Sequence, residues 1–153
     1  MNKYRTHTCS ELSEKEINKV VHLSGWLHRK RDHGNLLFID LRDHYGMTQC
    51  VIENDNDYFP ILEKSKPESV LKISGKVVKR SSETENSDLK TGKIEISIQS
   101  VEVLSDAKEL PMPVFGEQDY PEDIRLKYRF LDLRREEMHR NIILRSKVIS
   151  FIR

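Results

Sequence analysis

Residues 25–43 read Gly25-Trp26-Leu27-His28-Arg29-Lys30-Arg31-Asp32-His33-Gly34-Asn35-Leu36-Leu37-Phe38-Ile39-Asp40-Leu41-Arg42-Asp43. The centre of this stretch, residues 32–35, is typical of a tight turn, because glycine adopts positive φ freely and Asp and Asn tolerate it. After the turn, two sets of residues alternate with the period of a strand. They are Leu37, Ile39 and Leu41 on one face, and Leu36, Phe38 and Asp40 on the other. The stretch therefore predicts two strands joined by a hairpin turn, with the aliphatic face directed to a core.

The second face of this hairpin combines an aromatic ring with positive charge. Phe38 follows the turn, and the cationic run Arg29-Lys30-Arg31 precedes it. Such a surface can stack a nucleotide base and hold its phosphate. A core phenylalanine beside a solvated cationic edge would give the same pattern, so these residues alone leave both interpretations open.

Composition limits the class of protein. The chain has 153 residues, 33% of them charged and 37% hydrophobic, with a net charge of +1. This is enough for one domain with a core, and any site for a polyanion must be local. Cys9 and Cys50 lie far apart and outside metal-ligand spacing, which predicts reduced thiols and no metal site. No window reaches the ~18 apolar residues of a membrane helix, and residues 1–16 lack the apolar core of a signal peptide. We expect a soluble, cytoplasmic protein.

The order of predicted elements indicates the fold. Strands are predicted at 20–31, 36–42, 47–53, 69–79 and 93–104, with a short helix at about 58–66 between the third and fourth. Gly25 within the first strand predicts a bend or bulge there. The fold class is therefore all-β, a five-stranded OB-fold barrel with a helix between strands three and four. An antiparallel sandwich is the competing architecture, and the single helix argues against it.

The character of the sequence changes after this barrel, which we assign to residues 1–105. Residues 106–136 are predicted to be a linker or hinge, with a proline-punctuated connector at 110–116. Residues 137–153 are expected to begin an amphipathic helix that continues into a further domain. We therefore expect the chain to be part of a longer protein.

Four stretches in this order resemble one family, the bacterial-type aspartyl-tRNA synthetases of class II, in their N-terminal anticodon-binding domain. They are residues 25–34, 38–43, 91–95 (Thr91-Gly92-Lys93-Ile94-Glu95) and 125–135, and the last resembles the hinge that leads into the catalytic domain. The resemblance implies an aspartate–tRNA ligase that uses ATP and Mg²⁺ and dimerises through its catalytic domain. It places the catalytic motifs beyond Arg153, so no catalytic residue is assigned here and the chain alone is expected to be inactive.

The resemblance also implies a site that reads the anticodon G-U-C of tRNA-Asp. Guanine presents two adjacent donors, which a carboxylate complements, and Glu95 matches that position. Uracil presents one donor between acceptors, which an amide complements, and Gln49 matches that position. Phe38 matches the ring on which a base stacks. Each of these residues taken alone is equally an ordinary strand residue.

Four further residues complete the predicted anticodon site. Arg29, Arg31 and Arg80 are expected to contact phosphates or base edges, and His33 lies in the hairpin turn. Strict members of the family often carry leucine at the His33 position, and relaxed members, which also charge tRNA-Asn, often carry histidine. We expect His33 to mark a relaxed enzyme, an ordinary polar turn residue being the other interpretation.

One loop of the chain departs from the family pattern, and other families of protein share the same barrel. The family often has an asparagine in the loop at 81–90, whereas this chain has Thr84 nearest and Asn86 two residues on. The asparaginyl- and lysyl-tRNA synthetases share the barrel. A stand-alone single-strand-binding barrel or a scaffold without an RNA role are alternatives from other classes.

Overall fold

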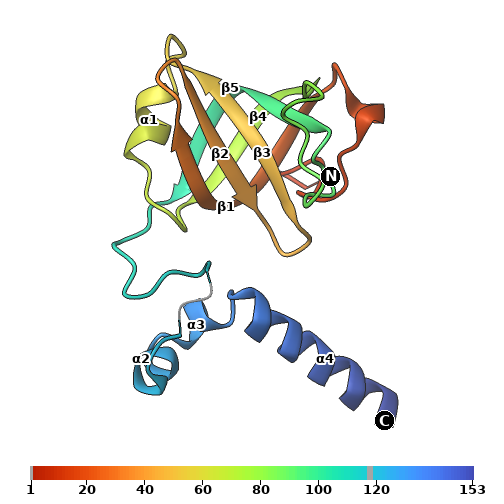
Figure 1. Ribbon diagram of the computed structural model, residues 1–153, viewed down its shortest axis with the longest axis vertical. Helices are drawn as coiled ribbons and strands as arrows, with labels where there is room; N and C mark the ends of the chain where they lie inside the picture. The colour runs from red at the N-terminus through yellow and green to blue at the C-terminus, as the bar shows by residue number, and fades with distance from the viewer. Residues whose placement is uncertain (1, 117–118) are drawn as a thin grey trace. The chain divides into compact units, whose positions relative to one another are not determined.

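The computed structural model describes residues 2–116 and 119–153 (Figure 1). The chain forms two compact units, Met1–Lys108 and Glu109–Arg153, and each has a buried apolar cluster of its own. None of the described helices is both long and apolar enough to cross a membrane.

The first unit is a closed barrel with the strand order β1-β2-β3-β5-β4. The strands are β1 (Val20–Asp32), β2 (Leu36–Arg42), β3 (Met47–Glu53), β4 (Val70–Lys79) and β5 (Ile94–Ser105). Pairing is antiparallel except between β3 and β5, and β4 closes the ring by pairing with β1. A short 3₁₀ helix, η1 (Glu14–Glu16), precedes β1, and α1 (Phe59–Lys64) lies between β3 and β4. The predicted OB-fold is confirmed.

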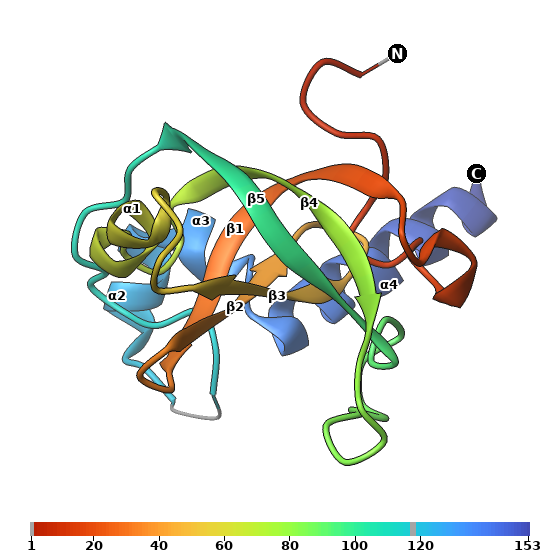
Figure 2. The same cartoon turned by 90° about the horizontal axis from the view of Figure 1, so that it is seen from above.

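The barrel core comes from the alternation that the sequence predicts. Leu37, Ile39 and Leu41 are buried along β2, whereas Leu36 and Phe38 are only partly buried. Helix α1 lies beside one end of the barrel in both views (Figures 1 and 2), and it contributes its buried Leu62 to the same core. The helix is shorter than predicted, because the backbone becomes extended at Ser65.

The strand irregularity in β1 lies at a different residue from the predicted one. The register shifts between Leu27 and Arg29, so His28 is an extra residue opposite β2, whereas Gly25 pairs with Leu71 of β4 without a shift in register. Gly25 instead allows close strand contact, since a Cβ there would lie 2.3 Å from the carbonyl oxygen of Arg42. The bulge moves every later residue of β1 to the opposite face of the sheet.

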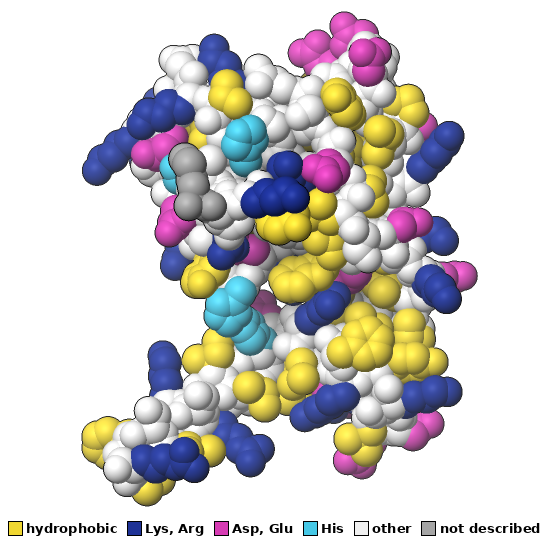
Figure 3. All heavy atoms as spheres, turned by 180° about the vertical axis from the view of Figure 1, so that it is seen from behind, with side chains coloured by type: hydrophobic (Ala, Val, Ile, Leu, Met, Phe, Trp, Pro, Cys, Tyr) yellow, Lys and Arg dark blue, Asp and Glu magenta, His cyan; other side chains and the backbone are white. Residues whose placement is uncertain are grey.

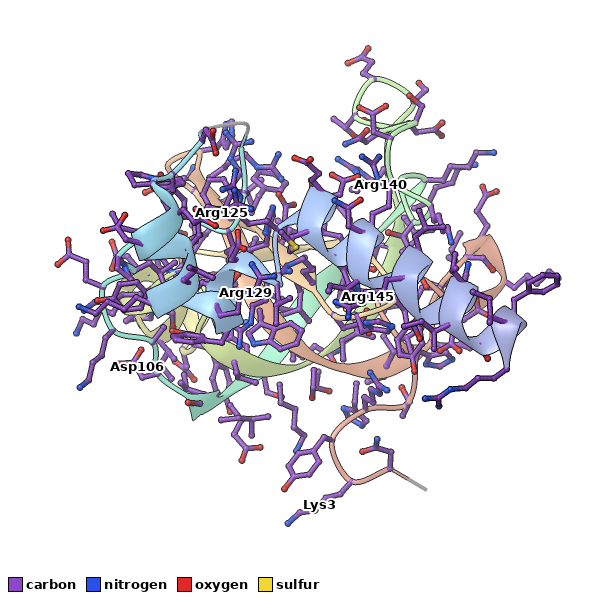
Figure 4. The ribbon with its side chains drawn as sticks, turned by 90° about the horizontal axis from the view of Figure 1, so that it is seen from below. Lys3, Asp106, Arg125, Arg129, Arg140 and Arg145 are labelled. Carbon is purple, nitrogen blue, oxygen red and sulfur yellow. The ribbon has the colours of Figure 1, made fainter. Side chains whose placement is uncertain are left out.

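The second unit has a small core of its own. It contains α2 (Glu122–Lys127), α3 (Arg129–Asp132) and α4 (Glu136–Ile152), and Met112, Val114 and Leu131 form its buried cluster. The range expected to be a linker, 106–136, thus includes two short helices. Buried Asp132 accepts hydrogen bonds from Arg125 Nε at 3.1 Å and Arg129 Nη1 at 2.6 Å, and Figure 4 shows these arginines on α2 and α3.

Candidate nucleic-acid interface

The strand register places the predicted site residues in two rows across the outer face of β1, β2, β3 and β5. Arg29 is opposite Asp40, and Asp40 is opposite Gln49. Because Cys50 pairs with Ile96 in parallel, Glu95 lies beside Gln49 and extends this first row. The second row runs through Arg31, Phe38, Val51 and Ser97. The predicted residues of four strands therefore share one face.

Arg29 and Arg31 reach this face only because of the bulge. An uninterrupted strand would alternate from buried Leu27 and direct both arginines inward. The extra residue at His28 changes the phase, so Arg29 is exposed and Arg31 is half-buried beside Phe38. Arg31 thus lies opposite Phe38 on the outer face, and Arg29 lies opposite Asp40 on the same face.

The aromatic part of the site is built by the hairpin turn. Gly34 has a φ of 77°, and its backbone N–H donates to Asp32 Oδ1 at 2.8 Å. This turn holds the exposed His33 so that its ring meets the half-buried ring of Phe38 edge-on, with 5.4 Å between centroids and an interplanar angle of 87°. His33 therefore lies beside the predicted stacking residue.

Gln49 is the centre of a hydrogen-bonded network. Its Oε1 accepts from Arg31 Nη2 at 3.1 Å and from Arg80 Nη2 at 3.0 Å. Its Nε2 donates to Glu95 Oε2 at 2.8 Å. Gln49 is 6% exposed, and the Glu95 side chain is 20% exposed. The two residues expected to read bases are thus in direct contact.

Arg80 is buried and bonded to protein groups, whereas a residue that contacts phosphates is expected to be exposed. It is only 8% exposed, and its Nε lies 3.8 Å from Glu95 Oε2. Its Nη1 also donates to the carbonyl of Gly92 at 3.4 Å. Arg80 therefore ties Gln49 and Glu95 to the base of the loop that joins β4 to β5.

These features belong to a known domain family. Residues 21–104, more than half of the chain, match the family described as OB-fold nucleic acid binding domain. The chain belongs to this family.

Relatives of this OB-fold domain support the predicted resemblance to aspartyl-tRNA synthetases, which is confirmed. A protein of Pelagibacter ubique named aspartate–tRNA(Asp/Asn) ligase is 69% identical over the whole chain. One of Phenylobacterium zucineum with the same name is 60% identical. The chain spans 26% of the length of each. The structure of asparaginyl-tRNA synthetase from Pyrococcus horikoshii, 27% identical, matches with a TM-score of 0.70 over 84% of this chain and 28% of that one.

Asp40 is a member of the site that sequence reasoning missed. It is 6% exposed, and its Oδ1 accepts from Arg31 Nη2 at 2.8 Å. Burial raises the pKa of its carboxyl above the ordinary value, and the charge of Arg31 opposes this only in part. The sequence feature that could have indicated Asp40 is its position on the same face of β2 as Phe38, beside a strand rich in cations.

The loop after Arg80 forms hydrogen bonds within itself. Thr84 Oγ1 donates to the carbonyl of Ser81 at 3.1 Å, and the backbone N–H of Asn86 donates to the carbonyl of Gly92 at 3.1 Å. Charges of both signs are interspersed on the face of the molecule in Figure 3. Because the net charge of the chain is only +1, the arginines of the OB-fold domain's site are a local group of positive charge.

Proposed function

We propose that this OB-fold domain binds the anticodon loop of tRNA-Asp as part of an aspartate–tRNA ligase. The observation that carries the proposal is the direct contact between Gln49 and Glu95 on the outer face that also holds Phe38. An amide and a carboxylate held together beside a ring suit adjacent unpaired bases, which is how proteins read single-stranded RNA by sequence. The names of the 60–69% identical relatives support the same function.

Each residue in the proposal has a defined task. Glu95, through its carboxylate, accepts from the two donors of guanine, and Gln49 complements the edge of uracil. Phe38 stacks a base, which contributes about 1–3 kcal/mol. Arg29 and Arg31 lie on the same face and balance the phosphate charge.

We also propose that the enzyme accepts tRNA-Asn. The two anticodons, G-U-C and G-U-U, differ only at the third base. The His33 ring lies against Phe38 at 5.4 Å, where it would contact a neighbouring base without requiring one particular base. The relatives named aspartate–tRNA(Asp/Asn) ligase support this specificity.

A titration of anticodon stem-loops tests both proposals. Fluorescence anisotropy at constant salt should show similar affinity for G-U-C and G-U-U loops, and weaker binding when the first or second base is changed. Phe38→Ala should weaken binding of every loop by about 1–3 kcal/mol, whereas Val51→Ala, in the same row, should have a small effect. Equal affinity for all loops would indicate a general single-strand binder, and no binding a scaffold. A strong preference for G-U-C over G-U-U would contradict the tRNA-Asn proposal alone.

The remaining activities belong to the longer protein in this proposal. ATP and Mg²⁺ would serve its catalytic domain, which would also form a homodimer, and the enzyme would act in the cytoplasm, where translation takes place. The chain alone should not aminoacylate tRNA.

A further inference from the structure

The orientation of the Gln49 amide is fixed from both ends. Two guanidinium groups donate to its oxygen, at 3.1 and 3.0 Å, and its nitrogen donates to a carboxylate at 2.8 Å. A rotation of the amide by 180° would direct its N–H groups at Arg31 and Arg80 and its oxygen at Glu95. That arrangement is strongly unfavourable, because it sets donors against donors and acceptor against acceptor.

One of the two guanidinium groups is itself held by Asp40. Arg31 Nη2 bridges Asp40 Oδ1 at 2.8 Å and Gln49 Oε1 at 3.1 Å. The Arg31 side chain is 39% exposed, whereas the Asp40 side chain is 8% exposed. A half-exposed arginine side chain has many rotamers, so a fixed and buried partner is needed to keep it against the amide.

We propose that Asp40 is a positioning residue that sets specificity for the middle base of the anticodon, an inference that rests on the function proposed above. Uracil presents a donor at N3 and an acceptor at O4, and cytosine presents the reverse. Because Arg31 and Arg80 occupy both lone pairs of the Gln49 oxygen, the held amide can offer a base only its second N–H, which donates to O4 of uracil and not to the amino group of cytosine. An amide that rotates would offer its oxygen instead and would accept cytosine as well. Asp40 touches no base in this scheme and acts through Arg31.

The setting of Asp40 agrees with a role other than stability. The carboxyl is buried on the outer face rather than in the aliphatic core, and burial raises its pKa, so the charged form is unfavourable in the folded domain. Replacement by a neutral residue of the same shape should therefore leave the barrel folded.

The test compares Asp40→Asn with the unchanged 153-residue chain in binding of loops with U or C at the middle position. The preference for U should fall about tenfold, because the uncharged side-chain oxygen of the variant holds Arg31 more weakly than a carboxylate does, while the free energy of unfolding at pH 7 is not lowered. Glu102→Gln is the matched control, because it removes an ion pair with Lys72 (3.1 Å) between β4 and β5, and it should keep the preference.

A second measurement needs no RNA. The hydrogen-bonded side-chain N–H of Gln49 should exchange slowly with water and have an NMR shift displaced from that of a free glutamine in the unchanged chain, and both effects should be reduced in Asp40→Asn. An unaltered preference or unaltered amide signals in the variant would overturn the inference, as would unfolding of the variant. If the unchanged chain binds U and C loops alike, the proposed function fails, and the amide signals still decide whether Asp40 orients Gln49.

Discussion

At the scale of single residues, the site depends on charges that are balanced within the protein. Gln49 and Glu95 were recognised because they match positions of the family that the chain resembles, and the structure places Gln49 Nε2 2.8 Å from Glu95 Oε2. Asp40 was not recognised, because its importance comes from a contact with Arg31 on a neighbouring strand. Residues at the positions of a known motif can be recognised from a sequence, whereas the residues that orient them depend on three-dimensional contacts.

The buried Asp40 gives a testable pH dependence at this scale. Arg31, Arg29 and His28 face it from β1 and Arg80 from the end of β4, but burial is the larger effect and the folded-state pKa is raised. The folded protein therefore binds more protons than the unfolded chain between the two pKa values, so stability falls as pH rises through this window. Urea unfolding of the unchanged chain and Asp40→Asn should show the variant gaining relative stability over that window. A constant difference at every pH would contradict this.

At the scale of elements, the strands could be predicted and the bulge could not. Alternation of aliphatic and other residues specified β2 and its buried face, because a period of two residues fits a half-buried strand and does not fit a helix. The extra residue at His28 has no such signature, because nothing in the composition distinguishes a bulged residue from a paired one. Alternation alone therefore predicts the wrong face for Arg29 and Arg31, although the family resemblance places them in the site.

Gly25 provides the prediction at the element scale. An alanine Cβ there would lie 2.3 Å from the Arg42 carbonyl oxygen, so Gly25→Ala must push β1 and β2 apart. We expect a loss of about 3 kcal/mol or more in the free energy of unfolding. Gly34→Ala is the comparison, because its Cβ would meet no atom within 4 Å and only its positive φ is unfavourable; it should lose about 1 kcal/mol. Equal losses in a urea titration would show that close contact at Gly25 is unimportant.

At the scale of the whole molecule, binding to RNA should depend only weakly on salt. The net charge is +1, and the cations on the outer face that are placed to meet phosphates are Arg29 and Arg31. With about two phosphate contacts, the logarithm of the affinity should fall with the logarithm of the salt concentration with a slope of about −1.4, and Arg29→Gln should reduce it by about 0.7. Anisotropy titrations from low to moderate salt measure this. A slope steeper than about −4 would indicate diffuse electrostatic binding without base recognition.

The joint between β3 and β5 is short, with two residue pairs, Cys50 with Ile96 and Val51 with Ser97. Gln49 lies on β3 and Glu95 on β5, so an anticodon that contacts both would bridge the two strands where the barrel has its shortest pairing. RNA binding and the pairing of β3 with β5 would then be thermodynamically linked. An RNA that contacts both residues would stabilise the pairing, and a substitution that weakens the pairing would lower the affinity for RNA even at a distance from the bases.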